Sequence, residues 1–249
     1  MYKDATQALN NLTPTLENIS KLAQEVGFDA CGIAPVRRLD EDALFMDKWI
    51  AQGLHGNMDY LERNCDKRYD PAKLVIGAQT VLVCLLTFEK SGRDYHRRVK
   101  SMLYQLEAKL KEHFGESIVS QEHQHIFCDS APMLERRWCV EAGLGFIGKN
   151  HQFIHPTLGS MVHPGEIILN IPITPDTTPL PPKTDAEQIP YQLGVHNGFI
   201  GTPCADCLLC VEACPTGALL NTVWDATQCT AYTTHHCLEC QLACPINHH

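Results

Sequence analysis

The sequence has no long apolar segment. No run of apolar residues approaches the about 18–20 that a helix needs to cross a bilayer, and the opening MYKDATQALNNLTPTLENIS lacks the apolar centre of a secretory signal. A membrane-spanning or exported protein is therefore not expected. The sequence predicts a cytoplasmic protein that makes no membrane contact.

An excess of positive charge is also missing. The chain has 20 Lys and Arg residues against 29 Asp and Glu residues, a formal net charge of −9. Non-specific attraction of the whole chain to nucleic acid is not expected, so an RNA contact would need a local basic face. The residues available for such a face are Arg37, Arg38, Arg63, Arg68, Arg97, Arg98, Arg136 and Arg137. The alternative is that most of these arginines lie on solvated helix faces.

Proline marks a change of composition after residue 172. The 249 residues are 44% hydrophobic, enough to bury a sizeable core. We expect a catalytic domain at 1–172, a proline-rich connector at 173–202 and a small module at 203–249. Because the module is too short for a core of its own, whatever its cysteines bind must organise it.

Apolar residues alternate between helical and extended spacing. Apolar faces predict helices at 15–26, 39–52, 94–114 and 133–142. Continuous apolar runs predict strands at 29–36, 80–88, 125–130, 151–155 and 166–169. The order indicates a mixed α/β (α+β) fold. The glycines of GLGFIGKN, at 143–150, permit close backbone approaches, but this string is not a G-x-G-x-x-G dinucleotide loop.

The thirteen cysteines are of two kinds. Five are scattered singly and are interpreted as small core residues: Cys31, Cys65, Cys84, Cys128 and Cys139. The other eight form two groups in the C-terminal module: Cys204, Cys207, Cys210 and Cys214, then Cys229, Cys237, Cys240 and Cys244. The first group reads C-x2-C-x2-C-x3-C-P, and the second ends in the same C-x3-C-P. This distribution differs from a secreted disulfide framework.

The spacing predicts two [4Fe-4S] clusters. Three cysteines on a tight turn can each reach a different iron, and in two-cluster ferredoxins the cysteine before proline binds the other cluster. The ligand sets are then Cys204, Cys207, Cys210 and Cys244 for one cluster, and Cys229, Cys237, Cys240 and Cys214 for the other. The alternative is a pair of zinc sites. A zinc site, however, would require neither the third cysteine at x2 nor the repeated C-x3-C-P ending.

Seven strings along the chain form a specific combination: GFDACGIAP, HGNMDYL, GRDYH, CDSAPMLERRW, AGLGFIGKN, GSMVHPGE and CADCLLCVEACPTGAL. Through them the sequence resembles the epoxyqueuosine reductase family, the cobalamin and iron–sulfur enzymes that complete the queuosine base in transfer RNA. It is similar, more distantly, to the reductive dehalogenases. The resemblance spans nearly the whole chain.

The resemblance implies a fold and a reaction. The fold is a cobalamin-binding domain related to flavin nitroreductases, with a ferredoxin-like double-cluster module. The clusters would pass electrons one at a time to cobalamin, and the resulting Co(I) can attack an epoxide carbon. Ring opening leaves negative charge on oxygen, so an acid must supply a proton. The family's acid, the aspartate of D-S/T-A-P, matches Asp129.

The proposed role of Asp129 requires a raised pKa. An aspartate keeps its proton at neutral pH when burial or a nearby negative charge raises its pKa well above about 4. The apolar strand end before Asp129 and a corrin facing it would have this effect. The alternative is structural: Asp129 caps the helix that begins near Met133 or pins the turn at Pro132.

The expected cobalamin is base-off, without a histidine below the cobalt. The D-x-H-x-x-G signature of histidine-ligated corrinoid proteins is absent from the sequence, and the nearest string, DYHRRV at 94–99, lacks the glycine. A cobalt without a strong lower ligand is easier to reduce. By resemblance, the corrin contacts are Arg68, Gly148, Lys149, Asn150, Gly159 and Ser160. For Arg68 and Lys149 a surface ion pair is the alternative.

The resemblance also implies partners: the anticodon stem-loop of tRNA and an electron donor such as a flavodoxin or ferredoxin. The chain itself is expected to be a monomer. It departs from the family in the short span between Cys229 and Cys237, in Ala231 and Ile246, where serine and tryptophan are usual, and in the lack of a helical-repeat tail after His249. Two other functions stay open: a non-catalytic electron-transfer protein and a corrinoid reductase of a small molecule.

Overall fold

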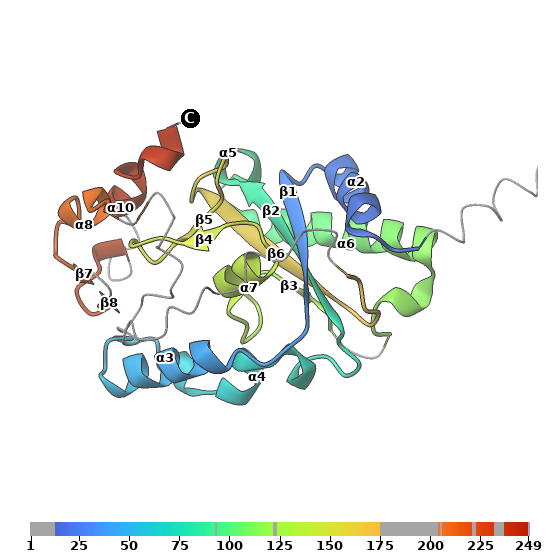
Figure 1. Cartoon of the computed structure of the whole chain (residues 1–249), viewed down its shortest axis with the longest axis horizontal. Helices are drawn as coiled ribbons and strands as arrows, with labels where there is room; N and C mark the ends of the chain where they lie inside the picture. The colour runs from blue at the N-terminus through green and yellow to red at the C-terminus, as the bar shows by residue number, and fades with distance from the viewer. Residues whose placement is uncertain are drawn as a thin grey trace, which may run out of the picture. The chain divides into compact units, whose positions relative to one another are not determined.

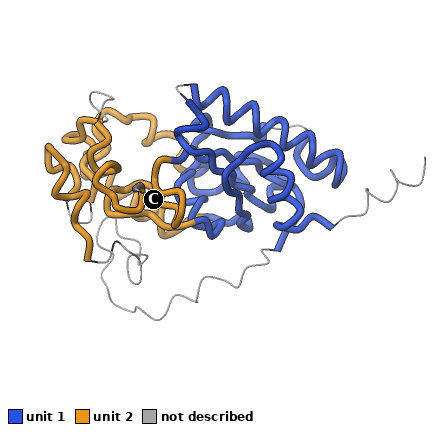
Figure 2. Tube along the Cα trace, turned by 90° about the horizontal axis from the view of Figure 1, so that it is seen from above, with its two compact units in different colours: residues 1–38, 66–144, 162–179 blue, residues 39–65, 145–161, 180–249 orange. Residues whose placement is uncertain are grey.

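The computed structural model describes residues 13–92, 94–121, 124–174, 204, 206–220, 223–231 and 237–248. By its contacts the chain divides into two compact units, coloured in Figure 2: unit 1 is 1–38, 66–144 and 162–179, and unit 2 is 39–65, 145–161 and 180–249. The expected connector at 173–202 lies, from residue 175 onward, outside the described residues. The domain boundaries expected from the sequence stay a prediction. The contacts show in addition that 39–65 and 145–161 belong to unit 2.

Unit 1 is built on a four-stranded antiparallel sheet (Figure 1). Its order is β1 (Ala30–Pro35), β2 (Thr80–Thr87), β6 (Val162–Leu169) and β3 (Ile126–Phe127). The apolar run predicted as a strand at 80–88 is β2, which is buried along nearly its whole length between β1 and β6. Strand β3 is shorter than the predicted 125–130, because the backbone turns at Asp129, where φ is 48°.

Helices α2 (Leu16–Val26) and α6 (Tyr95–Phe114), both predicted from their apolar spacing, pack on one face of this sheet. The Thr15 hydroxyl caps α2 by accepting from the N–H of Asn18 at 3.3 Å, and Gly27 ends it with φ 107°. Gly165 on β6 lets α6 approach, since a Cβ there would lie 2.6 Å from Val99 Cγ1.

Helix α7 (Glu135–Glu141) covers the opposite face. Gly32 pairs with Val83 across β1 and β2, whereas Gly165 pairs with Cys84, the next residue along β2. Successive side chains of a strand point to opposite faces, so the two glycines mark opposite sides of the sheet. A Cβ at Gly32 would lie 2.4 Å from the carbonyl oxygen of Ala142, directly after α7. The sheet is therefore sandwiched between α6 and α7.

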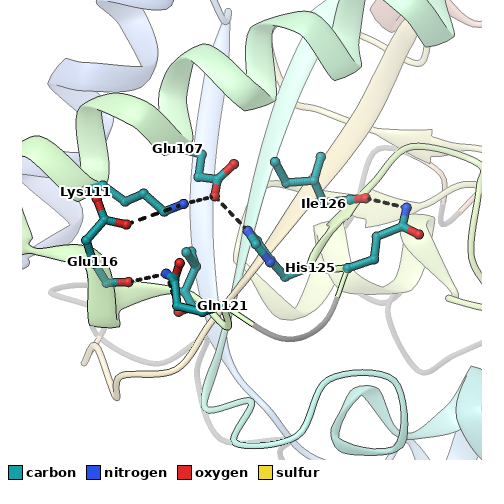
Figure 3. Close-up of polar contacts among 8 residues, drawn as sticks. Glu107, Lys111, Glu116, Gln121, His125 and Ile126 are labelled. Atoms are coloured by element: carbon teal, nitrogen blue, oxygen red, sulfur yellow. Dashed lines mark hydrogen bonds and ion pairs between the residues drawn. The ribbon is translucent and has the colours of Figure 1, made fainter.

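A polar network ties the end of α6 to the segment before β3 (Figure 3). The buried Glu107 carboxylate accepts from Lys111 Nζ at 2.6 Å and contacts His125 Nε2 at 3.0 Å. Burial raises the pKa of Glu107, but hydrogen bonds from Lys111 and His125 lower it by more, so that it lies below the usual range. Glu107 is therefore held as an anion between two elements that are distant in sequence.

Unit 2 contains the long helix α3 (Asp40–Ala51) and several short elements. Trp49 of α3 stacks on Trp224 with ring centroids 5.6 Å apart, and its Nε1 donates to the Trp224 carbonyl at 2.6 Å. The short elements of unit 2 are η1 (Asp59–Glu62), β4 (Phe146–Ile147), β5 (Phe153–Ile154), α8 (Leu209–Glu212), β7 (Leu219–Leu220), β8 (Val223–Trp224), α10 (Glu239–Leu242) and η5 (Pro245–His248). Strand β7 pairs with β8, with Leu219 opposite Trp224.

The remaining short elements are α4 (Cys65–Tyr69), η2 (Pro71–Lys73), α5 (Phe88–Ser91) and η3 (Glu116–Ile118). The sequence pattern predicted none of these single turns. Among the helices of the described ranges, none has the length and apolar content needed to span a bilayer.

Candidate functional site

Two copies of one short motif form the cysteine-rich part of unit 2. The strings CLLCVEACP, at 207–215, and CLECQLACP, at 237–245, each place a four-residue helix, α8 or α10, just before a Cys-Pro. The C-cap residues Ala213 and Ala243 have nearly the same backbone angles, φ −73° and ψ −11° against φ −75° and ψ −10°. The two helices pack against each other. The repeated sequence therefore folds as a repeated structure.

One recess in unit 2 is lined by four thiols: Cys204, Cys207, Cys210 and Cys244. They are the residues that the crossed arrangement assigns to the first cluster. Ile154, Leu209 and Ile246 give the same recess an apolar wall. Burial, followed by the neighbouring thiols, raises the pKa of Cys210 to about 11. Four thiols in this setting need a cationic centre before they can all ionise, and a metal cluster supplies one.

Cys240 lies among the other three cysteines of the predicted second set. Burial raises the pKa of Cys240 to about 11, together with the nearby sulfurs of Cys210, Cys229, Cys237 and Cys214. Three of these neighbours complete the predicted second set. Within the described residues, no three His, Cys, Asp or Glu side chains are arranged to hold a single metal ion. The thiolates that bind a cubane cluster lie farther apart than the ligands of a single metal ion, because each thiolate binds a different iron.

The sulfur of Cys214 is surrounded by hydrogen-bond donors. Desolvation raises its pKa, but the backbone and hydroxyl of Thr216 and the N–H groups of Leu219 and Ala218 lower it by more, so that the pKa lies below the usual value. A second donor of this kind, the Lys149 N–H, faces Cys204. Such N–H groups stabilise thiolates and tune cluster potentials, so the donor set fits iron–sulfur ligation.

The residues expected to hold a corrin are mostly engaged within unit 2. Asn150 Oδ1 accepts from the Gln152 N–H at 3.1 Å, and its Nδ2 lies 3.5 Å from the Cys240 carbonyl. Asn247 brackets Ser160, donating to its hydroxyl at 2.9 Å and accepting from its N–H at 2.6 Å. These two side chains therefore fasten the cysteine segment to the loops at 145–161.

The two glycines of the predicted corrin set have similar structural roles. A Cβ at Gly148 would lie 2.4 Å from Ile154 Cδ1, and one at Gly159, where φ is 69°, would lie 2.0 Å from Asn247 Oδ1. Lys149 lines the four-thiol recess. The side chain of Arg68 on α4 is buried, so an exposed surface ion pair does not describe it. The corrin contacts predicted for these residues stay a prediction.

Asp129 lies at the end of β3, with its side chain exposed. Its φ of 48° is unusual for a residue with a side chain and is the kind of strain found at functional sites. The Tyr95 hydroxyl donates to Asp129 Oδ2 at 2.7 Å, and the Asp129 N–H donates to Glu135 Oε1 at 2.5 Å. Helix α7 has Leu134 at its N-cap and no side-chain cap. Asp129 is therefore not the helix cap considered from the sequence.

The expected rise in the pKa of Asp129 is wrong for this structure. Desolvation raises it, but hydrogen bonds from Glu135 and Tyr95 and the charges of His96 and Arg136 lower it by more. The net pKa lies below the usual value, so Asp129 is ionised at neutral pH. The proton expected on Asp129 must therefore be held elsewhere.

Two neighbouring carboxyls, which the sequence interpretation gave no role, hold protons instead. Burial raises the pKa of Glu135 well above its usual value, and the hydrogen bond to Asp129 and the charge of Asp129 add to the rise. Burial and then the charge of Asp129 do the same for Glu166, which is fully buried and has no hydrogen-bond partner for either oxygen among the described residues. Both glutamates lie inside strings already noted, CDSAPMLERRW and GSMVHPGE. Only their burial, which the sequence does not show, separates them from surface glutamates.

Rings stack beside Asp129. His163 lies between Phe88 and Tyr95, with ring centroids 4.2 and 3.7 Å away and interplanar angles of 15° and 3°. Burial lowers the pKa of His163 to about 4, so it is neutral at pH 7. Desolvation and the hydrogen bond to Asp129 raise the pKa of Tyr95. Tyr95 therefore stays protonated as a donor to Asp129.

Comparison with known proteins gives the class of this chain. No family model matches the sequence. It is 33% identical to the epoxyqueuosine reductase of Cyclobacterium marinum over 87% of this chain and 67% of the relative. It is 32% identical to that of Leadbetterella byssophila over 88% of this chain and 68% of the relative. Both relatives are oxidoreductases.

Solved structures match in the same way. An epoxyqueuosine reductase from Streptococcus thermophilus has a TM-score of 0.74 at 22% identity, covering 94% of this chain and 66% of that one. A second, with an epoxyqueuosine-modified tRNA stem-loop, has a TM-score of 0.72 at 23% identity, covering 93% and 65%. The chain belongs to the epoxyqueuosine reductase family. It spans about two thirds of the length of these relatives.

Two further structures bear on the expectations from sequence. A Bacillus subtilis epoxyqueuosine reductase, at 24% identity and a TM-score of 0.67 over 93% of this chain and 64% of that one, has an aspartate-bearing catalytic loop swung out of the active site. A reductive dehalogenase associated with B12-dependent dehalogenation matches at 16% identity and a TM-score of 0.53, covering 98% and 36%. The predicted distant similarity to dehalogenases is confirmed at the level of the fold.

Proposed function

We propose that this protein reduces epoxyqueuosine in tRNA to queuosine, using two [4Fe-4S] clusters and base-off cobalamin. The observation that carries the proposal is membership of the epoxyqueuosine reductase family together with the two four-thiol sets of unit 2. Unit 1 would be the nitroreductase-related part and the cysteine segment the ferredoxin-like module. A flavodoxin or ferredoxin would donate the electrons, and the protein would act as a cytoplasmic monomer.

The iron–sulfur ligands in this proposal are the crossed sets. The first is Cys204, Cys207, Cys210 and Cys244, and the second is Cys229, Cys237, Cys240 and Cys214. The recess lined by the first set and the N–H groups around Cys214 support this assignment. Crossing places each Cys-Pro on the cluster of the other motif, which the packing of α8 against α10 favours.

Cobalamin, when bound, supplies a reduced cobalt centre able to attack an epoxide carbon. The residues proposed to contact it are Arg68, Lys149 and the loops at 148–150 and 159–160. Because the Asn150 and Ser160 side chains are occupied by Gln152, Asn247 and Gln241, their role is to fix those loops. Asp129 supplies the proton to the oxygen released by ring opening, and its exposure and its Tyr95 hydrogen bond support this role.

The first half of α6 is the proposed RNA contact. Its N-terminal turns carry the exposed Arg97 and Arg98, followed by Lys100, although cations are disfavoured at this end of a helix. Two shallow grooves share Arg97, Ser101 and Gln105, and the second of them also includes Tyr104, which is 56% exposed. Phosphates would offset the charge of the arginines, and Tyr104 offers a face on which a base can stack.

A reconstitution experiment tests the proposed function. The clusters are rebuilt anaerobically, cobalamin is added, and conversion of an epoxyqueuosine stem-loop is measured by mass spectrometry. Conversion that Asp129→Asn reduces by about 10²–10⁴-fold supports the proposal. Redox-active clusters with no cobalamin affinity would instead identify an electron carrier. Cobalamin binding without conversion of RNA would identify a reductase of another substrate.

A further inference from the structure

Asp129, Glu135 and Glu166 form a cluster of three carboxyls that reaches from the buried sheet to an exposed loop. Glu166 on β6 pairs directly with Phe127 of β3, two residues before Asp129. Glu135 begins α7, which packs against β6, and its Oε1 accepts from the Asp129 N–H at 2.5 Å. The Glu135 carboxyl also hydrogen-bonds the Asp129 carboxylate. The cluster therefore has a buried end at Glu166 and an exposed end at Asp129.

Three carboxylates this close cannot all be ionised. Glu166 is fully buried and, within the described part of the chain, neither of its oxygens has a hydrogen-bond partner. An ionised carboxylate in that position would cost several kcal/mol, of the order of the effective burial penalty of an ion, so Glu166 is neutral. Glu135, which is 8% exposed, lies between neutral Glu166 and ionised Asp129. Glu135 is therefore the carboxyl that holds the proton that Asp129 lacks.

We propose that Glu135 and Asp129 share one proton, which is stored on buried Glu135 and delivered to the substrate through exposed Asp129. The inference rests on the proposed function, because it names the source of the proton that ring opening consumes. It also resolves the disagreement between an acid expected at Asp129 and an Asp129 that is ionised in the structure. Glu135 is a positioning and proton-storing residue, and Asp129 is the group that touches the substrate.

The proton balance of the pair is simple. The proton moves from the Glu135 carboxyl to the Asp129 carboxylate, and the O–H bond of Asp129 breaks as the new O–H bond forms on the alkoxide oxygen. The pair then carries one more negative charge and regains its proton from water. The Tyr95 hydroxyl, 2.7 Å from Asp129 Oδ2, keeps its own proton and holds the carboxylate in place. No electron enters or leaves the pair.

The titration of the pair depends on the groups that face it from each neighbouring element. Asp129 and Glu135 are faced by Tyr95 and His96 from α6, by Arg136 and Cys139 from α7, by His163 and Glu166 from β6, and by Cys128 at the end of β3. Strongly coupled carboxyls lose their protons in two macroscopic steps that belong to the pair rather than to either residue. The single-proton form is the one competent to donate.

Infrared spectroscopy of the full chain, with neither substrate nor cobalamin, tests where the protons reside. Protonated carboxyls give a carbonyl band distinct from that of carboxylates, and at pH 7 we expect one contribution from Glu135 and one from Glu166. Glu135→Gln and Glu166→Gln should each remove one contribution. Asp129→Asn should shift the Glu135 contribution, because it replaces the hydrogen-bond partner. Glu141→Gln is the matched control on α7, since Glu141 pairs with Arg37.

The outcomes separate this inference from the proposed function. An unchanged carboxyl band in Glu135→Gln, or an unshifted Glu135 band in the folded Asp129→Asn variant, would overturn proton sharing even if the enzyme reduces epoxyqueuosine. If the bands behave as expected and the stem-loop is not converted, the shared proton stands and the proposed substrate fails. If Glu135→Gln does not fold, the shift of the Glu135 band expected in Asp129→Asn still tests the inference.

The pH profile gives a second readout in the loaded enzyme. In the wild type, activity falls as pH rises through the upper pKa of the pair. Glu135→Gln keeps the hydrogen bonds to Asp129 but has no stored proton, so we expect a loss of about 10²–10⁴-fold at pH 7 with recovery toward acid pH. A structural role for Glu135 would lower activity without moving this profile. An unmoved profile therefore overturns the inference.

Discussion

Asn247 brackets Ser160 with both atoms of its carboxamide, accepting from the Ser160 N–H at 2.6 Å and donating to the Ser160 hydroxyl at 2.9 Å. The same Nδ2 donates to the Gln241 carbonyl at 2.6 Å, and Gln241 Nε2 donates to the Ser160 carbonyl at 2.9 Å. One buried serine thereby joins the loop at 155–161 to the segment that carries Cys240 and Cys244. A sequence departure at Ile246, beside Asn247, leaves this contact in place.

Removing the Asn247 carboxamide should loosen the iron-binding segment. Asn247→Ala leaves the buried Ser160 N–H without its partner, which costs about 1–3 kcal/mol, and leaves the Ser160 hydroxyl with only the longer contact from Gln241 Nε2 at 3.3 Å. Asn247→Asp keeps the acceptor and loses the donor, so its effect should be smaller. We expect a chelator to remove iron faster from both variants in that order. Gln228→Ala, at an exposed position of unit 2, is the control, and equal rates in all four proteins would contradict the role of Asn247.

The crossed ligand sets predict a specific pattern of iron loss. A double variant that removes Cys214 and Cys240 should lose one cluster and keep about four irons. A double variant that removes Cys204 and Cys214 should lose ligands of both clusters and keep about none. Uncrossed motifs would reverse the two results. Iron and sulfide analysis after anaerobic reconstitution measures this, with Cys65→Ala expected to keep about eight irons as the control.

The sequence predicted the long elements because their signals are local. Apolar spacing located α2, α3, α6 and β2 to within a few residues, and Thr15 and Gly27 marked the two ends of α2. The C-x2-C spacing singled out three thiols of the recess, Cys204, Cys207 and Cys210, and their role as cluster ligands stays a prediction. Each of these signals lies within a short stretch of chain.

The acid cluster was not predictable from local patterns. Nothing in the sequence around Glu166 or Glu135 distinguishes them from exposed glutamates, since their burial arises from the packing of α7 on β6. The direction of the Asp129 pKa shift depends on the hydrogen bond to Glu135 and then on the one from Tyr95, which is 34 residues away. The contacts of Asn150 with Cys240 and of Ser160 with Gln241 and Asn247 were not predictable for the same reason, because these partners lie near the end of the chain. Long-range contacts therefore decide the chemistry of the site.

Glu107 should make the stability of unit 1 depend on pH. Its pKa in the folded protein is lowered, since hydrogen bonds from Lys111 and His125 outweigh the effect of burial. A lowered folded-state pKa contributes stability above the pKa of the unfolded state, and this contribution is lost as pH falls through the folded pKa. Glu107→Gln should therefore be less stable by about 1–3 kcal/mol at pH 7 and should lose part of the acid dependence. Urea unfolding at several pH values measures both effects.

A parallel pH dependence in wild type and in Glu107→Gln would contradict the assignment of this effect to Glu107. Glu25→Gln, which removes an exposed partner of Lys109, is the control.

The basic half of α6 should bind RNA through phosphates. Arg97→Ala and Arg98→Ala should each weaken stem-loop binding and lower the slope of log affinity against log salt by about 0.7–0.9 for each lost phosphate contact. Tyr104→Ala should weaken binding by about 1–3 kcal/mol if a base stacks on the ring, with the salt slope unchanged. Fluorescence anisotropy at several salt concentrations separates the two effects.

Lys109→Ala removes a cation from the same helix away from both grooves, so it is the matched control. If it changes the slope as much as the arginine variants do, the attraction is a property of the whole surface rather than of the α6 grooves.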